Sequence, residues 1–211
     1  MYRPFIDDPA HIALLEGQRY VVLRPNGSVR DAYAQVRARV QDKLAGLPVS
    51  YPIQPHVTLA GFGKGTSLDA VRELVADWAP TVPPLRLEVE ELGVFPSPFQ
   101  IVVARVRRTP ELGDALATLR EQARQYKLTD VATVEPSDWI FHMSVAYCSP
   151  LSAAAWADVA AWVETVTVAA AECTVTEVEI VAIDNGQEYS GGVLGLTAGP
   201  PKNIRERQPV R

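Results

Sequence analysis

Hydrophobic positions along the chain recur with two different periods, and segments of the two kinds alternate. Runs rich in β-branched residues, or with apolar and polar residues in strict alternation, predict strands at 19–25, 56–62, 85–95, 99–106, 141–148, 173–184 and 191–198. Apolar residues spaced by three and four positions predict helices at 28–44, 67–79, 109–126 and 152–166. The mixture predicts an α+β fold, in which the last two strands are expected to pair as a hairpin.

The first predicted helix is the most regular of the four. Its apolar face is formed by Val29, Tyr33, Val36, Val40 and Leu44. The hydroxyl residues at the starts of the first three helices can each accept a backbone N–H with their side-chain oxygen. The expected caps are Ser28, the serine at position 67, and Thr109, which is followed by a proline in the first helical turn.

The order strand–helix–strand–helix–strand occurs twice, at about 19–95 and again at 99–184. Segments 21–36 and 102–119 resemble each other, with an insertion in the second. The repeat predicts one bilobal domain over 19–198, in which two pseudo-symmetric lobes each have an antiparallel sheet and two helices, with a cleft between them. The alternative is two unrelated segments that share a common alternation of strand and helix.

Each copy carries one histidine in its second strand, followed two positions later by a hydroxyl residue. The first copy reads HVTL from His56, with Thr58, and the second reads HMSV from His142, with Ser144. Alternate side chains of a strand share a face, so each histidine lies about 7 Å from its hydroxyl partner on one side of the strand. Lobes related by a dyad would bring the two imidazoles and two hydroxyls together across a cleft.

This set of side chains suits proton transfer at a phosphate. Histidine titrates near neutral pH, so one ring can take a proton from water while the other gives one to a leaving oxygen. Hydroxyl groups can donate hydrogen bonds to the phosphate oxygens. No metal is required, and two histidines with two hydroxyls make a poor zinc site.

The other interpretation is structural, since a single histidine in a strand is more often a hydrogen-bonded, half-buried residue. The same pattern in both copies favours a site. The third histidine, His11, has no such partner and is expected to be structural or exposed.

Composition narrows the class of protein further. The chain has 211 residues, 47% of them hydrophobic, with a net charge of −5. This charge weighs against binding to duplex DNA, although a small phosphate pocket needs only a few local donors. The sequence shows neither a signal peptide nor an apolar run long enough to cross a membrane, so the cytoplasm is the expected location. The protein is also expected to be a monomer. Residues 1–18 are interpreted as an N-terminal extension and 199–211 as a flexible tail.

Two cysteines, Cys148 and Cys173, form no metal-binding or disulfide pattern and are expected to be small core residues.

The paired motifs resemble the 2H phosphoesterase superfamily, which includes the 2′-5′ RNA ligase-like proteins and 2′,3′-cyclic phosphodiesterases. The segment ELGVFPSPFQIVVARV at 91–106 is also similar to the part of these proteins that links the lobes. The resemblance implies that His56 and His142 are the catalytic acid and base, without an assignment of which is which. It also implies that Thr58 and Ser144 hold the phosphate, and that no cofactor is needed.

Where many relatives carry an arginine after the first motif, this chain reads AGFGKG. Lys64 could supply that charge, although a loop lysine is the favoured interpretation. Phe62 shares the strand face of His56 and is a candidate to line the cleft. Tyr147 could stack on a base. However, the alternation of side chains along the strand places it on the other face from His142, in the core. Arg105, Arg107 and Arg108 could meet an RNA backbone, but a solvated charged end is favoured.

The resemblance implies hydrolysis of 2′,3′-cyclic phosphates at RNA ends or on small nucleotides. Two alternatives stay open at this point. One is a module that binds RNA ends or nucleotides with little turnover, and the other is 2′-5′ RNA ligation, which is the reverse of the same chemistry.

Overall fold

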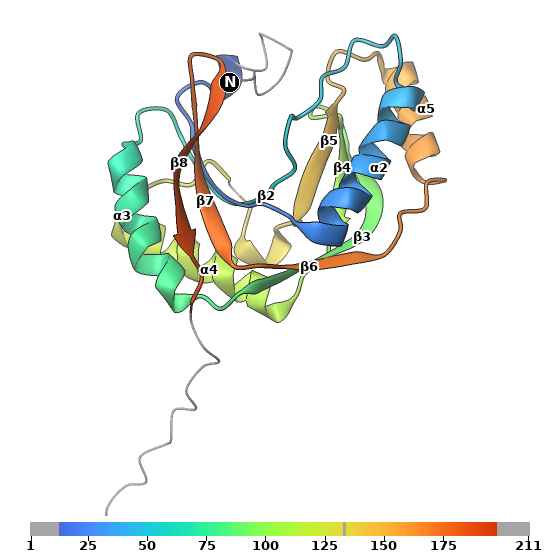
Figure 1. The fold of residues 1–211 in the computed structure, drawn as a ribbon. Helices are drawn as coiled ribbons and strands as arrows, with labels where there is room; N and C mark the ends of the chain where they lie inside the picture. Colours follow the sequence, from blue (N-terminus) through green and yellow to red (C-terminus); the bar gives the residue numbers. More distant parts are fainter. Residues whose placement is uncertain (1–12, 133, 198–211) are drawn as a thin grey trace, which may run out of the picture.

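Within the residues that the structure describes, eight strands form two four-stranded antiparallel sheets that stand side by side (Figure 1). The computed structural model describes residues 13–132 and 134–197. The first sheet has the order β2 (Val57–Phe62), β1 (Arg19–Leu23), β7 (Glu177–Asp184) and β8 (Gln187–Gly195). The second sheet has the order β5 (His142–Tyr147), β4 (Ile101–Val106), β3 (Leu85–Phe95) and β6 (Ala171–Val175). His11 and the expected tail lie outside the described residues.

The helices cover the outer sides of the sheets (Figure 1). They are α2 (Gly27–Lys43), α3 (Leu68–Trp78), α4 (Pro110–Gln125) and α5 (Ala153–Val163). Helix α3 packs on the first sheet, and α5 packs on the second. Helix α2 follows β1 of the first sheet but packs against β5 and β6 of the second. Helix α4 follows β4 and lies between the lobes, in contact with α3, with β2 of the first sheet and with β3 of the second. The predicted α+β fold with two lobes is confirmed, and both halves of the chain contribute to each lobe.

The predicted apolar face of the first helix is confirmed. Each of Val29, Tyr33, Val36, Val40 and Leu44 is at most 3% exposed. These residues belong to a continuous hydrophobic core that also includes residues from both sheets. Burial of such a stripe, rather than helix propensity alone, stabilises a helix of this length. Of the two cysteines, Cys148 is buried and Cys173 is half-buried, and neither is in a disulfide.

The segment 173–184, predicted as a single strand, is in fact two strands in different sheets. Strand β6 ends at Val175 in the second sheet, and β7 begins at Glu177 in the first. The alternation is interrupted at the junction, where Thr176 and Glu177 are consecutive polar residues, and this interruption coincides with the change of sheet. The predicted hairpin with β8 is confirmed. It turns at Asn185 and Gly186, which both have positive φ, as the tight hairpin turn requires.

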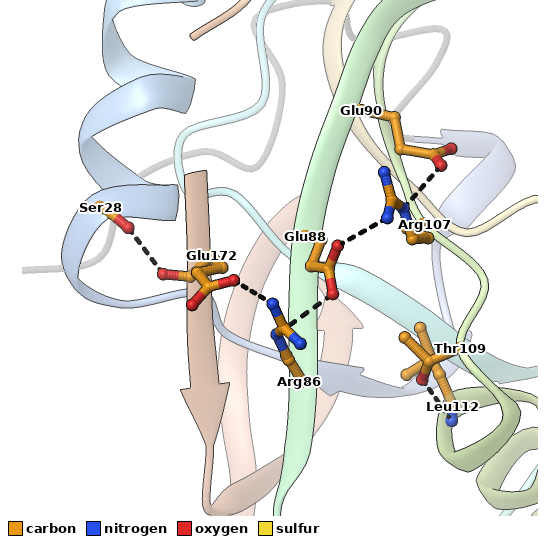
Figure 2. Close-up of polar contacts among 8 residues, drawn as sticks. All are labelled: Ser28, Arg86, Glu88, Glu90, Arg107, Thr109, Leu112 and Glu172. Atoms are coloured by element: carbon orange, nitrogen blue, oxygen red, sulfur yellow. Dashed lines mark hydrogen bonds and ion pairs between the residues drawn. The ribbon is translucent and has the colours of Figure 1, made fainter. Parts of the chain in front are cut away.

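Figure 2 shows the charged contacts that tie β6, β3 and the end of β4 together. Arg86 bonds Glu172 of β6 and Glu88 of its own strand, and Arg107 reaches Glu88 and Glu90. Figure 2 also corrects one predicted cap, because the Ser28 hydroxyl donates to the Glu172 carbonyl at 2.6 Å instead of capping α2.

The other two predicted caps have different outcomes. The cap of α4 is confirmed, since Thr109 Oγ1 accepts from the Leu112 N–H at 3.2 Å. Ser67 occupies the N-cap position of α3, but its side chain makes no capping hydrogen bond.

Candidate active site

A cavity of about 220 Å³ lies between the two sheets. Side chains of the inner strands β1, β2, β7, β4 and β5 line most of it. The lining residues are Leu15, Tyr20, Val22, His56, Thr58, Ile101, Ser144, Tyr147, Val181 and Ile183. Three of the four motif residues, His56, Thr58 and Ser144, therefore meet in one cavity, although they come from different lobes.

The fourth motif residue, His142, lines an adjoining smaller pocket on the same side of β5. Its ring meets the Phe95 ring edge-on, with the ring centroids 4.7 Å apart. The two histidines nevertheless interact, because the charge of His142 contributes to lowering the pKa of His56. The structure thus brings both histidines to the junction of the two lobes.

Both histidine rings are held by the same local bond. His56 Nδ1 lies 3.3 Å from the Gln54 carbonyl oxygen, and His142 Nδ1 lies 2.8 Å from the Ile140 carbonyl oxygen. A carbonyl can only accept, so Nδ1 carries the proton and donates it in each ring. In the neutral form this leaves Nε2 as the nitrogen that accepts a proton.

The surroundings favour the neutral form of both rings. Burial lowers the pKa of His56 to about 3, with further lowering by the positive charges of Arg24 and His142. Burial also lowers the pKa of His142, and the bond to the Ile140 carbonyl partly opposes this. Both imidazoles are consequently neutral in the free protein near pH 7.

An arginine stands across the sheet from each histidine, and the sequence interpretation missed the first of these. Leu23 pairs with Val57, so Arg24, the next residue, faces His56 along the ladder. Arg24 is clamped by Glu179, at 2.6 Å, and by Glu188.

The same arrangement recurs in the second sheet, where Arg105 pairs directly with His142 and contacts Glu91 at 3.3 Å. The similarity between 21–36 and 102–119 contained the signal for this pair, since it aligns Arg24 with Arg105.

The structure corrects the predicted positions of two aromatic residues. In β5 the register shifts so that Val103 pairs with Ser144 and Val102 with Ala146, which leaves one extra residue between them. This β-bulge reverses the parity beyond Ser144 and turns Tyr147 into the cavity. The expectation that Tyr147 faces away from the site is wrong.

A matching bulge in β2 has the opposite consequence for Phe62. Val22 pairs with Thr58 and Val21 with Ala60, so parity reverses beyond Thr58. Phe62 is fully buried and does not line the cavity, contrary to expectation. Lys64 is an exposed loop residue whose Nζ donates to the Ala13 carbonyl at 3.2 Å, and it lies outside the cavity lining.

Two further observations concern the part of the chain that the structure describes. No group of three or more His, Cys, Asp or Glu side chains there is placed to hold a metal ion. None of the helices within those residues is both long and apolar enough to span a membrane.

Comparison with known proteins places this fold. The same two-sheet fold occurs in LigT of E. coli, with a TM-score of 0.60 and 17% identity over 86% of this chain and 98% of that one. It also occurs in TT0787 of Thermus thermophilus, with a TM-score of 0.59 and 15% identity over 85% and 97% of the two chains. Usb1 of Kluyveromyces marxianus is more distant, with a TM-score of 0.50 and 10% identity over 87% and 99%.

The fold is thus that of solved phosphoesterases. The sequence model of the 2′-5′ RNA ligase superfamily matches residues 28–187. Because this match covers well over half of the sequence, the chain belongs to the 2′-5′ RNA ligase superfamily, a group of 2H phosphoesterases. No curated protein matches the sequence significantly.

Proposed function

We propose that this protein is a phosphodiesterase that hydrolyses 2′,3′-cyclic phosphates at RNA ends or on small nucleotides, without a metal. One observation carries the proposal. His56, Thr58 and Ser144 line one cavity between the lobes, and His142 stands beside it with its ring fixed in the same way as that of His56. The structures of LigT complexed with 3′-AMP and with ATP support a nucleotide-sized ligand.

The reaction follows from the two rings. One histidine accepts a proton at Nε2 from the attacking water, whose oxygen bonds the phosphorus. The other, as imidazolium, gives its Nε2 proton to the ribose oxygen that leaves as its bond to phosphorus breaks. Thr58 and Ser144 donate hydrogen bonds to the non-bridging oxygens as their negative charge grows.

The substrate itself promotes the imidazolium form. In the free protein, burial keeps both rings neutral, and Arg24 adds to this at His56. A phosphate placed between the rings brings negative charge within a few ångströms and favours the protonated form. Binding of the anion therefore supplies the acid, and each Nδ1–H keeps its carbonyl partner in either protonation state.

The test is turnover of the four nucleoside 2′,3′-cyclic phosphates in EDTA, with His56→Ala and His142→Ala as variants. Each variant is expected to lose at least about 10²-fold in rate, which is the usual contribution of a general acid or base. His11→Ala is the matched control and is expected to retain the wild-type rate. The products are identified by NMR as 2′- or 3′-phosphates.

Three outcomes would contradict the proposal. Activity that disappears in EDTA and returns with zinc would indicate a metal enzyme. Saturable binding of cyclic nucleotides without product would indicate a binding module. Formation of a 2′-5′ bond between RNA ends, with no hydrolysis of cyclic phosphates, would indicate a ligase.

A further inference from the structure

The face of the second sheet that is turned towards the cavity continues beyond the motif residues to Arg105. Strand β4 pairs regularly along its length, because the extra residues at its two register shifts belong to the neighbouring strands β3 and β5. Ile101, Val103 and Arg105 therefore share one face of the sheet. Ile101 lines the cavity, so Arg105 stands on the face that is turned towards it.

The side chain of Arg105 lies across β3, over Gly93. A Cβ at Gly93 would come within 2.5 Å of Arg105 Nε and within 3.3 Å of its Cδ and Cζ. Strands β3 and β5 flank β4 on opposite sides, so the side chain points away from His142, with which Arg105 pairs. The φ of Gly93 is not positive, so the backbone itself does not require glycine. The missing side chain at Gly93 thus makes the room in which the guanidinium lies.

Most of the hydrogen-bonding capacity of this guanidinium is unused. It has five N–H donors, and among the described residues its charged partner is Glu91, 3.3 Å from Nη1. The Glu91 side chain is 61% exposed, and exposed ion pairs of this kind contribute little. Arg105 Nε is buried without a hydrogen-bond partner. Arg24 of the first sheet differs, because Glu179 and Glu188 both hold it. Arg105 can therefore still take up an anion.

The guanidinium lies at some distance from the place where the reacting phosphate would be held. Val103 pairs with Ser144 on one side and with Gly93 on the other, so these three residues stand in one row across the sheet. Neighbouring strands lie about 4.8 Å apart, which puts Gly93 roughly 10 Å from Ser144. Such a separation suits two phosphates that are joined through one ribose, with one phosphate at each end of the row.

We propose that Arg105 binds a second phosphate of the substrate, attached to the 5′ oxygen of the ribose whose 2′,3′-cyclic phosphate reacts. The proposal rests on the proposed function, which places the first phosphate at the histidines. The planar guanidinium matches a phosphate, to which it presents paired N–H donors. The group is either the 5′-phosphate of a free nucleotide or the last internucleotide phosphate of an RNA end. A nucleoside 2′,3′-cyclic phosphate lacks it.

The experiment compares kcat/KM for adenosine 2′,3′-cyclic phosphate, for the same compound with a 5′-phosphate, and for the dinucleotide ApA that ends in a 2′,3′-cyclic phosphate. The added phosphate should raise kcat/KM about tenfold, as expected for hydrogen bonds to a charged group. Because this phosphate does not react, the gain should lie in KM, with kcat little changed. A gain for both compounds assigns the site to any 5′-phosphate, and a gain for the dinucleotide alone assigns it to an RNA end.

Variants around the guanidinium give a readout that a merely structural arginine would not change. Arg105→Ala should reduce the ratio between the 5′-phosphorylated and the unphosphorylated substrate to about one. Gly93→Ala should lower the same ratio, because its Cβ displaces the guanidinium. Glu91→Gln removes the competing carboxylate and should raise the ratio. Arg107→Ala is the matched control, because Arg107 follows the end of β4 and already pairs with two glutamates (Figure 2).

Two results would overturn this proposal while the phosphodiesterase stands. Equal kcat/KM for the three substrates in the wild type would mean that no second phosphate is bound. An equal loss for all three in Arg105→Ala would mean that the arginine acts on the reacting phosphate or on the fold.

If no substrate is turned over, the proposed function fails, and calorimetric affinities for adenosine 3′-monophosphate and adenosine 3′,5′-bisphosphate decide the role of Arg105. The bisphosphate should bind about tenfold more tightly than the monophosphate to the wild type and no more tightly to Arg105→Ala. Equal affinities in the wild type would overturn the proposal.

Discussion

Arg24 shows how a single residue can set the charge of the proposed site. It lies across the sheet from His56, and two glutamates hold its guanidinium in place. Its positive charge lowers the pKa of His56, in addition to the larger effect of burial. His56 is thereby kept neutral, while Glu179 and Glu188 balance the positive charge of Arg24.

The low pKa of His56 predicts how stability depends on pH. Its pKa is about 3 in the folded protein and 6.5 in the reference state. Between these values the unfolded chain binds a proton here and the folded chain does not, so acid favours unfolding. As the pH falls below about 6.5, His56 should remove up to about 1.4 kcal/mol of stability per pH unit.

The measurement is urea unfolding at several pH values from 7.5 down to 4.5, for the wild type and for His56→Gln. Glutamine does not titrate, so the free energy of unfolding of the variant should fall less steeply with acid. Parallel curves for the two proteins would show that His56 has an ordinary pKa in the fold.

At the scale of elements, regular patterns were predictable from the sequence, whereas the points at which a strand bulges or changes sheet were not predicted. Period-two and period-three-to-four spacing located the strands and helices, and the two His-x-hydroxyl motifs located the cavity. The bulges in β2 and β5 each add one residue at the start of a run without polar residues, 59–62 and 145–147, where no alternation is left to show which face a side chain takes. Parity arguments therefore hold up to Thr58 and Ser144 and fail beyond them, as Phe62 and Tyr147 show.

Gly61, just beyond the bulge in β2, leaves little room for a side chain. A Cβ at this position would lie 2.9 Å from Val131 Cγ2 and 3.0 Å from Tyr20 Cε1. Because the Val131 N–H also bonds the Gly61 carbonyl at 2.7 Å, that segment has little freedom to move away. Gly61→Ala is expected to cost about 1–3 kcal/mol in unfolding free energy, as other overpacked positions do.

Gly63→Ala is the matched control, because its Cβ would meet only Val131 Cγ1, at an ordinary 3.6 Å. Urea unfolding of the two variants measures the difference directly. Equal stability of both would mean that the segment at Val131 yields freely and that the close approach does not require glycine.

For the molecule as a whole, the lobes are interleaved to an extent that the repeat in the sequence does not reveal. The first sheet joins β1 and β2 with β7 and β8 from the other end of the chain, and the chain crosses between sheets at Thr176. Helix α2 packs on the sheet opposite to the strand that it follows, and α4 contacts β2 of the opposite sheet as well as β3 of its own. Local periodicity predicts which helices and strands form. Which sheet each of them joins is decided by packing between residues far apart in sequence, and periodicity carries no signal for that packing.

This interleaving predicts that the two lobes unfold as one cooperative unit. Leu74 of α3 is fully buried against the first sheet, and Leu74→Ala should cost about 2–5 kcal/mol. Native-state hydrogen exchange is expected to show the same loss of protection in the central strand β4 of the second sheet as in β1 of the first, because opening either sheet exposes helices that cover the other. Glu73→Ala, at the exposed preceding position, is the control and should change neither the stability nor the protection of the two strands. Loss of protection confined to the first sheet would show that the lobes open independently, and the cavity would then lie between two separately stable parts.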